Sequence, residues 1–351
     1  MRFYSLDALR GFAALAVVFF HLSPGWPGYL AVDLFFILSG FVLSFRYFDE
    51  EQHNSHQQTT LSQFVILRLA RLWPLHAFTL FTILIVYLAT NSMPNYGDGA
   101  TLSFLSHFLL VQNTGILNHW LSWNEPSWSI SVEFWVNLVV FAYIAKRGNT
   151  LLLLILSIVG YILLSTQYHH LDLHIHLLWG YVNTGLIHCF AGFFLGMVVY
   201  RVYRVIEAMP APSWPPFVLK LVMTILEVGF LFACFYLMVH TEIRARTDFI
   251  APVLFSVTIL VFVFQYGWLS RLLRLTRLDY LGTLSFSIYL NHFWLLALYR
   301  TLHIPHYGYS STVLLWVFGA LIPISIFTYY LVEKPGQKWM IKGARRLKLL
   351  N

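Results

Sequence analysis

Long apolar runs separated by short polar segments make up most of this chain. In ten places the run is long enough, at 1.5 Å per helical residue, to cross about 30 Å of hydrocarbon. These runs lie near residues 4–22, 28–46, 74–92, 128–145, 150–166, 185–200, 218–239, 249–267, 280–299 and 311–332. The pattern predicts an all-α polytopic membrane protein with ten transmembrane helices.

An eleventh apolar run, residues 102–117, is shorter and is interrupted by Ser106, His107, Gln112 and Asn113. If this run does not cross the membrane, the basic clusters that follow it fall on the cytoplasmic side, as the positive-inside bias requires. If it crosses, those clusters fall outside. We therefore expect 102–117 to be re-entrant or interfacial, and both termini to be cytoplasmic.

The composition agrees with lipid as the solvent of this chain. Hydrophobic residues make up 58% of the 351 and charged residues 11%, with a mean hydropathy of +0.68. A soluble domain carries about a quarter charged residues. The 12 Trp and 20 Tyr suit a protein that meets the membrane interfaces many times. We expect one membrane domain, 1–335, followed by a short basic cytoplasmic tail, 336–351.

The net charge of +7 does not indicate a nucleic-acid partner, because Lys and Arg are scattered at the ends of apolar runs and form no stripe. Cys189 and Cys234 both lie inside apolar runs, so they support neither a disulfide framework nor a thiolate metal site. Arg10 interrupts the first run, and no small-residue cleavage site follows it. This favours a retained first helix over a cleaved signal peptide.

Two ionisable residues share the first predicted helix. Arg10 and His21 are eleven residues apart, which is close to three helical turns and about 16 Å of rise, so they lie on one face. With the N-terminus inside, Arg10 lies in the cytoplasmic half and His21 near the outer end. A snorkelling arginine and an interfacial histidine would give the same pattern without a function.

Two carboxylates follow at similar predicted depth. Asp33 opens the second run and can orient an imidazole such as that of His21, or it can simply favour a helix N-terminus. Glu133 lies one turn after Ser129 on the fourth run. A carboxylate among aromatic residues in a membrane helix is costly, which favours a functional role for Glu133.

Two more sets of polar residues are candidates. Tyr289 and His292 lie well along the ninth run, in its predicted outer half. Arg68 and Arg71 lie one turn apart just ahead of the third run. Guanidinium pairs suit phosphates, but the positive-inside bias alone would also place them there.

A histidine-rich loop is the one segment that suggests a metal. It contains His169, His170, Asp172, His174 and His176. No cysteine or flanking carboxylate completes a tetrahedral set, so a solvated loop is favoured and no metal is expected. Phosphate-loop, dinucleotide and Gly-x-Ser-x-Gly motifs are absent from the sequence.

In combination, five of these motifs resemble bacterial acyltransferase family 3. Their order and spacing match from residue 5 to about residue 335. The motifs are Arg10-x10-His21, the run Val32 to Gly40, Arg68-x-x-Arg71-x-x-Pro74, the block Trp128 to Glu133, and the block Ser285 to His292. The sequence from Glu333 to Pro335 also looks like the end of that family's domain. Asn291 and His76 stand where aromatic residues are more usual.

The resemblance implies a bacterial inner-membrane enzyme that O-acylates carbohydrates, with acyl-CoA as donor and no permanently bound cofactor. Whether the acceptor glycan is lipid-linked stays open at this point. We expect the version of the family that is without the C-terminal SGNH domain that some members carry. Arg68 and Arg71 would hold the phosphates of coenzyme A, and its pantetheine arm would extend past Arg10.

His21 would then act as general base toward a sugar hydroxyl. Glu133 or Asp33 would fix its tautomer, and Ser129, Tyr289 and His292 would support the acceptor. A two-step route through an acyl group on Ser129 or Ser131 stays open at this point.

A secondary transporter is the alternative from another class, because intramembrane charges and a re-entrant segment also suit a solute pathway. Transporters usually show two related halves. Residues 1–175 and 176–351 show no such correspondence. This favours a single catalytic site.

Overall fold

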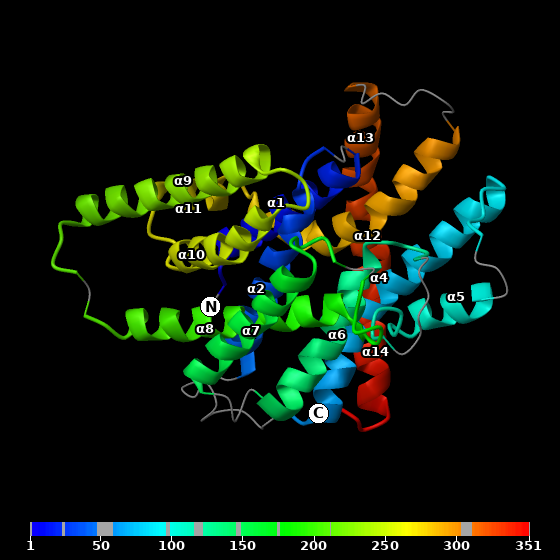
Figure 1. Ribbon diagram of the computed structural model, residues 1–351, viewed down its shortest axis with the longest axis horizontal. Coiled ribbons are helices and arrows are strands. Elements are labelled where there is room, and N and C mark those ends of the chain that lie inside the picture. The colour runs from blue at the N-terminus through cyan, green and yellow to red at the C-terminus, as the bar shows by residue number, and fades with distance from the viewer. Residues whose placement is uncertain are drawn as a thin grey trace.

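The computed structural model describes residues 2–22, 25–47, 59–95, 99–115, 122–144, 149–173, 176–210, 212–302 and 311–350. The described residues form helices almost throughout, with one two-stranded antiparallel hairpin. Figure 1 shows the helices gathered into one bundle. The expected all-α polytopic architecture is confirmed.

The elements follow one another with short connections. In chain order they are α1 (Tyr4–Leu22), η1 (Gly28–Leu30), α2 (Ala31–Tyr47), α4 (Leu61–Ala89), α5 (Ala100–Phe108), α6 (Ser127–Val139), η3 (Val140–Ile144), α7 (Thr150–Gln167), β1 (Leu177–Leu178), β2 (Val182–Asn183), α8 (Thr184–Glu207), α9 (Pro216–His240), η4 (Arg246–Ile250), α10 (Ala251–Val263), α11 (Trp268–Leu275), α12 (Asp279–Leu302), α13 (Ser311–Thr328), η5 (Tyr329–Glu333) and α14 (Lys334–Arg346).

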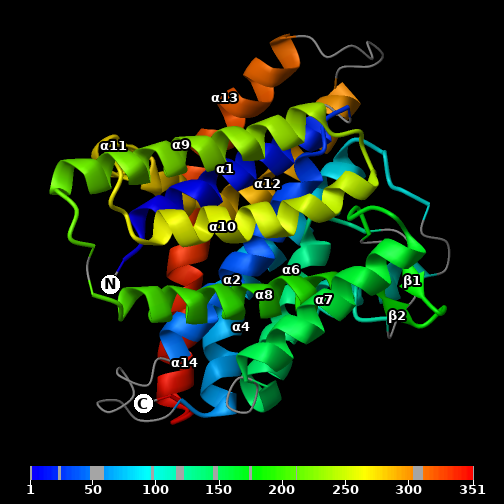
Figure 2. The same cartoon turned by 60° about the vertical axis from the view of Figure 1, so that its left-hand side comes forward.

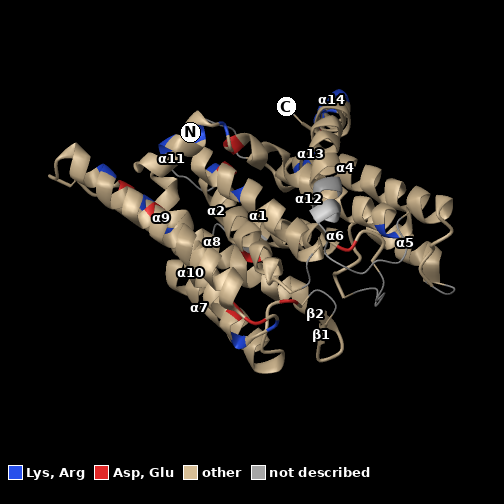
Figure 3. Ribbon diagram, turned by 90° about the horizontal axis from the view of Figure 1, so that it is seen from above, with Lys and Arg blue, Asp and Glu red and all other residues tan. Residues whose placement is uncertain are grey.

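Nine helices of the described residues are long and apolar enough to cross a membrane. The predicted span 128–145 falls instead on a shorter apolar helix, Ser127–Ala142, so the count of ten is not confirmed. In the described part of the run 102–117, residues 102–108 belong to the nine-residue helix α5, whose rise of about 14 Å is less than half of the hydrocarbon thickness. Its re-entrant or interfacial position stays a prediction. Figure 3 shows how few charged residues the helices carry.

The polar segment before α6 enters the interior of the bundle. Asn124 is fully buried, and its side-chain amide donates to the backbone oxygen of Leu290, about midway along α12. Gln112 donates to the backbone oxygen of Ser127, which is also buried. Helix α6 therefore begins inside the bundle.

Two helix pairs position the interior groups. Helix α1 packs along α12, and α2 packs along α8 (Figure 2). At Gly282 of α12 an added Cβ would lie 1.9 Å from the backbone oxygen of Asp7, and at Gly196 of α8 it would lie 1.9 Å from that of Ile37. Small residues let membrane helices approach closely, so both crossings require glycine.

The last elements form one long rod. Helices α13 and α14 are joined by η5, and the membrane-length helix Val317–Arg346 includes most of this rod. Part of the predicted tail 336–351 is therefore helical. Gly336 packs against Pro74 of α4, where an added Cβ would lie 2.5 Å from the proline Cβ. This contact places the start of α14 against the arginine-bearing helix α4.

Candidate active site

Two cavities lie in series along the same four helices, α1, α2, α6 and α12. On α1 the first cavity is lined by Arg10 and the second by His21. On α6 they are lined by Glu133 and by Trp128, respectively. The four helices therefore connect two sites of different chemistry.

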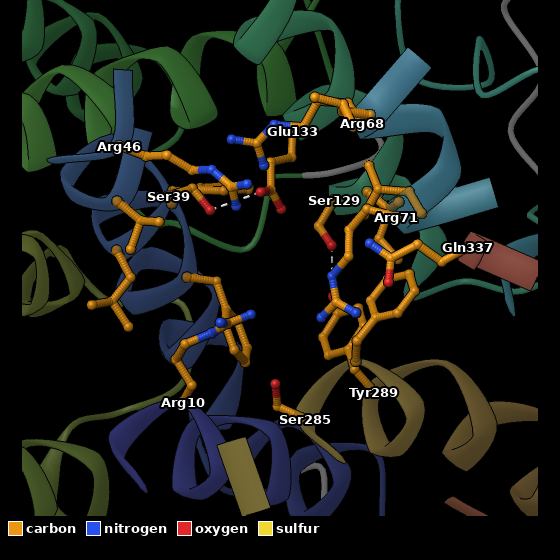
Figure 4. A pocket seen from close by; sticks show the side chains of 18 of the residues that line it. Arg10, Ser39, Arg46, Arg68, Arg71, Ser129, Glu133, Ser285, Tyr289 and Gln337 are labelled. Carbon is orange, nitrogen blue, oxygen red and sulfur yellow. Dashed lines mark hydrogen bonds between the residues drawn. The ribbon is translucent and has the colours of Figure 1, made fainter. Parts of the chain in front are cut away.

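The first cavity has a volume of about 380 Å³ and is lined by four arginines (Figure 4). They come from three helices: Arg10 from α1, Arg46 from α2, and Arg68 and Arg71 from α4. Gln337 of α14 also lines this cavity. The structure thus brings together the predicted donor-binding residues and adds Arg46, the basic residue in the last turn of α2.

Arg68 and Arg71 lie within α4, not ahead of it. The side chain of Thr60 accepts from the backbone N–H of Gln63, while the side chain of Gln63 accepts from the backbone N–H of Thr60. This capping box starts the helix at Leu61, well before the apolar run. Residues three apart on a helix share a face, which explains why both guanidinium groups reach one cavity.

Two carboxylates accompany the four arginines. Glu133 lines the cavity and accepts a hydrogen bond of 2.7 Å from the hydroxyl of Ser39. Glu333, only 1% exposed, forms an ion pair with Arg71 and accepts a 2.8 Å bond from Ser287. Four guanidinium groups against two carboxylates leave a surplus of positive charge. Arg10, Arg68 and Arg71 are half-buried and Arg46 is exposed, so these guanidinium groups can reach an anion that enters the cavity.

The second cavity, of about 240 Å³, combines acid–base groups with aromatic walls. His21, Glu125 and His188 line it, as do Trp128 and Phe293. Asp172 and Arg244 at its wall form an ion pair of 2.8 Å. Two imidazoles and two carboxyl groups therefore line this cavity, beside Arg244 and Arg300.

Polar and aromatic contacts join the two cavities. The rings of His21 and His292 have centroids 5.1 Å apart, and those of His292 and Tyr289 are 6.0 Å apart. The Tyr289 and Ser129 hydroxyls are hydrogen-bonded at 2.9 Å, and both residues line the first cavity. The predicted supporting residues Ser129, Tyr289 and His292 therefore lie together at the boundary between the cavities.

The expected contact between Asp33 and His21 is wrong. Asp33 Oδ1 accepts from His188 at 2.7 Å and from Tyr161 at 3.1 Å, whereas Oδ2 has no hydrogen-bond partner in the described structure. The reason is the helix pairing. Helix α2 packs on α8, which carries His188, while His21 on α1 packs against His292 of α12.

The expected pairing of Glu133 with His21 is also not found, since Glu133 lines the arginine cavity and His21 lines the other one. The predicted depth of Glu133 implies a fourth run that begins at the outer surface. Because the segment around Asn124 enters the bundle, α6 begins deeper and Glu133 lies farther along, beside Ser39 of α2.

Several residues of these cavities were not singled out from the sequence. Arg46, Glu125 and His188 belong to this group, and Glu333, which pairs with Arg71, was named only as part of the motif at the end of the domain. His188 offered a signal, because it is an ionisable residue within the run 185–200, and the cost of such residues in membranes applies to it as to His292.

The histidine-rich loop forms no cluster of metal ligands in the part of the chain that the structure describes. His174 lies outside the described residues. The rings of His170 and His176 have centroids 6.0 Å apart, and His176 stacks on Tyr168 at 4.7 Å. Asp172 is engaged by Arg244.

The fold and these cavities define an integral membrane protein in which shared helices line an arginine-rich first cavity and a second cavity that contains histidines. The chain belongs to acyltransferase family 3, because the family model described as an acyltransferase domain matches residues 3–332. No solved structure matches the chain at a significant level.

Curated relatives are similar over part of the chain. The peptidoglycan O-acetyltransferase OatA of Listeria monocytogenes is 28% identical over 171 residues, covering 44% of this chain and 27% of its own length. Acyltransferase MdmB of Streptomyces mycarofaciens is 31% identical over 38% of this chain and 37% of its own length. "Protein 2 in picA locus" of Rhizobium radiobacter is 33% identical over 46% of this chain and 93% of its own length. The match thus spans well under half of the two relatives named as acyltransferases.

Proposed function

We propose that the protein is an integral-membrane O-acyltransferase that moves an acyl group from cytoplasmic acyl-CoA to a hydroxyl of an envelope glycan. The observation that carries this proposal is the pair of cavities in series, one rich in arginine and one containing His21. The family supplies acyl transfer, and two of the relatives bear names that include O-acetyltransferase or acyltransferase.

The arginine cavity suits the phosphates of coenzyme A. Guanidinium groups donate hydrogen bonds in a planar fork that matches phosphate oxygens, and they stay charged even when partly buried. Arg10, Arg46, Arg68 and Arg71 would compensate the phosphates, while Glu133 and Ser39 keep part of this network oriented. The about 16 Å of rise between Arg10 and His21 on α1 is the distance that the pantetheine arm would cover.

His21 would be the general base in the second cavity. In the transfer step the sugar oxygen forms a bond to the thioester carbonyl carbon while its proton moves to His21. The carbon–sulfur bond then breaks, and the coenzyme A thiolate leaves and is protonated. Positioned general bases commonly contribute 10²–10⁴-fold to the rate of such steps.

The deciding experiment uses the purified protein in lipid nanodiscs with radiolabelled acetyl-CoA and a panel of envelope glycans, including peptidoglycan fragments. Labelled glycan is the expected product. The same protein is also reconstituted into sealed proteoliposomes, where movement of a labelled solute across the membrane, without any labelled glycan in the nanodisc assay, would instead support the transporter alternative.

The proposal also requires the arginine cavity to face the cytoplasm and the His21 cavity to face outward. Both termini would then lie on the cytoplasmic side of the inner membrane. Tyr181, which is 80% exposed on the β1–β2 hairpin, and Lys348 near the C-terminus are suitable positions for single cysteines. Cys189 and Cys234 are replaced in the same background.

In this test, an impermeant maleimide should label the cysteine at 181 in intact spheroplasts and the one at 348 only after lysis. The physical reason is the positive-inside bias, which holds the basic C-terminal helix α14 in the cytoplasm. Labelling of position 348 in intact spheroplasts would reverse the proposed orientation of both cavities.

A further inference from the structure

His188 of α8 is a buried histidine held by a carboxylate. Its side chain is 1% exposed, and its Nε2 lies 2.7 Å from Oδ1 of the fully buried Asp33. The hydroxyl of Tyr161 donates to the same oxygen at 3.1 Å, and the ring of Phe36 packs edge-on at 5.4 Å. Three neighbouring helices, α2, α7 and α8, therefore fix the orientation of this imidazole.

The other ring nitrogen of His188 has no protein partner. A carboxylate only accepts hydrogen bonds, so Nε2 carries the proton that is donated to Asp33, and in the tautomer with its one proton on Nε2 the other nitrogen, Nδ1, is an acceptor. Nδ1 is buried and has no hydrogen-bond partner within the described ranges. Buried polar atoms are rarely left in this state.

The position of His188 indicates what the missing partner is. The ring lines the second cavity, which also contains His21. A group that pairs with Nδ1 must be a donor, such as a hydroxyl. The aromatic rings of Trp128 and Phe293 supply apolar surfaces in the same cavity. Donor groups next to apolar faces are the combination that a sugar ring presents.

We propose that His188, oriented by Asp33, accepts a hydrogen bond from a hydroxyl of the glycan acceptor and so selects polyhydroxylated substrates. The proposal rests on the proposed function and adds an acceptor-binding residue to it. The hydroxyl bound by His188 is separate from the one that His21 deprotonates. His188 therefore contributes to acceptor affinity more than to the rate of the chemical step.

Two substitutions separate this role from a merely structural one. The amide of Asn reaches about as far as Nδ1 of histidine, whereas the amide of Gln reaches about as far as Nε2. His188→Asn therefore keeps an acceptor at the position of Nδ1 and loses the contact with Asp33. His188→Gln keeps the contact with Asp33 and loses the acceptor. His76→Gln is the matched control, because His76 is fully buried and lines neither cavity.

The test measures binding of labelled triacetylchitotriose and maltotriose to the protein in nanodiscs, together with acetyl transfer to each. We expect His188→Gln to weaken binding of the preferred probe about 10-fold or more, the size expected when a buried hydroxyl loses its partner. His188→Asn should recover most of this loss. The affinity for acetyl-CoA should be unchanged in both variants, and His76→Gln should bind both ligands like the wild type.

Binding by His188→Gln that equals the wild type, or equal losses in both variants, would overturn the proposal in favour of a structural role. So would a wild type that binds neither probe. Binding that follows the expected order without any acetyl transfer would leave the His188 site standing and refute the proposed function instead.

Discussion

The two cavities share four helices but differ in the groups they present. The first cavity offers four arginines, which only donate hydrogen bonds and stay charged. The second offers the imidazoles of His21 and His188 and the carboxyl group of Glu125, beside Arg300 and beside Arg244, which is paired with Asp172. Helix α1 thus presents a guanidinium group to the first cavity and an imidazole to the second. Under the proposed function, donor binding and proton transfer would be separated along the helix axes.

Removal of His21 should have the largest effect on catalysis while leaving donor binding intact. His21→Ala should lower acetyl transfer by about 10²–10⁴-fold, because the acceptor hydroxyl loses its general base. Acetyl-CoA affinity should stay unchanged, since the arginine cavity does not include His21. Single-turnover transfer and equilibrium binding of acetyl-CoA measure the two quantities separately. Wild-type turnover would remove His21 from the chemistry.

Neutralising one arginine of the first cavity should instead affect donor binding. Arg68→Ala should weaken acetyl-CoA binding about 10-fold or more, the scale of a lost charge-assisted hydrogen bond, with little change in turnover at saturation. Arg68→Lys should recover only part of the affinity, because an ammonium lacks the planar fork. Titration of acetyl-CoA checks both variants.

Arg68 is a cleaner choice than Arg71 for this experiment. Removal of Arg71 would leave Glu333 buried without its ion-pair partner, which itself destabilises the protein. Arg201→Ala is the control, since Arg201 of α8 donates a hydrogen bond to the hydroxyl of Thr150 and lines neither cavity. Equal donor affinity in Arg68→Ala and Arg201→Ala would place coenzyme A outside the arginine cavity.

The sequence predicted the helices well because the membrane imposes one local rule, a long apolar run for each span. It also placed Arg10 and His21 on one face of α1, since the helical period fixes their relation. What it missed depends on contacts between helices. Asp33 was assigned to His21 from depth alone, and only the packing of α2 on α8 shows that His188 is its partner.

Irregular segments caused the other errors. Glu133 does not meet His21, because Asn124 before α6 is buried and hydrogen-bonded to α12, a feature without a periodic signal. Helix α4 begins at Leu61, well before the predicted run 74–92. The apolar run marks only the lipid-facing part of the helix, whereas the capping box at Thr60 sets its first turn. Both sites contain residues from four or more helices, and hydropathy along the chain does not encode which helices meet.

The prediction with the smallest expected effect concerns a covalent acyl group on the protein at the boundary between the cavities. The Ser129 hydroxyl lies 3.1 Å from the backbone oxygen of Pro126 and 2.9 Å from the Tyr289 hydroxyl. Neither neighbour is a base, and a serine needs an adjacent base to become a nucleophile. Ser131, the other candidate, is fully buried and donates to the backbone oxygen of Leu110 at 2.8 Å.

We therefore expect direct transfer, with Ser129→Ala lowering turnover by no more than about 10-fold through loss of one neutral hydrogen bond at the boundary. Tyr289→Phe removes the other partner of the same bond, so the double variant should be no slower than the slower single variant. Quenched incubation with radiolabelled acetyl-CoA should leave no label on the protein. Loss of all transfer in Ser129→Ala, together with label on the wild-type chain, would instead establish a two-step route. In that case the boundary between the cavities would itself be the site where the acyl group passes from the arginine side to the histidine side.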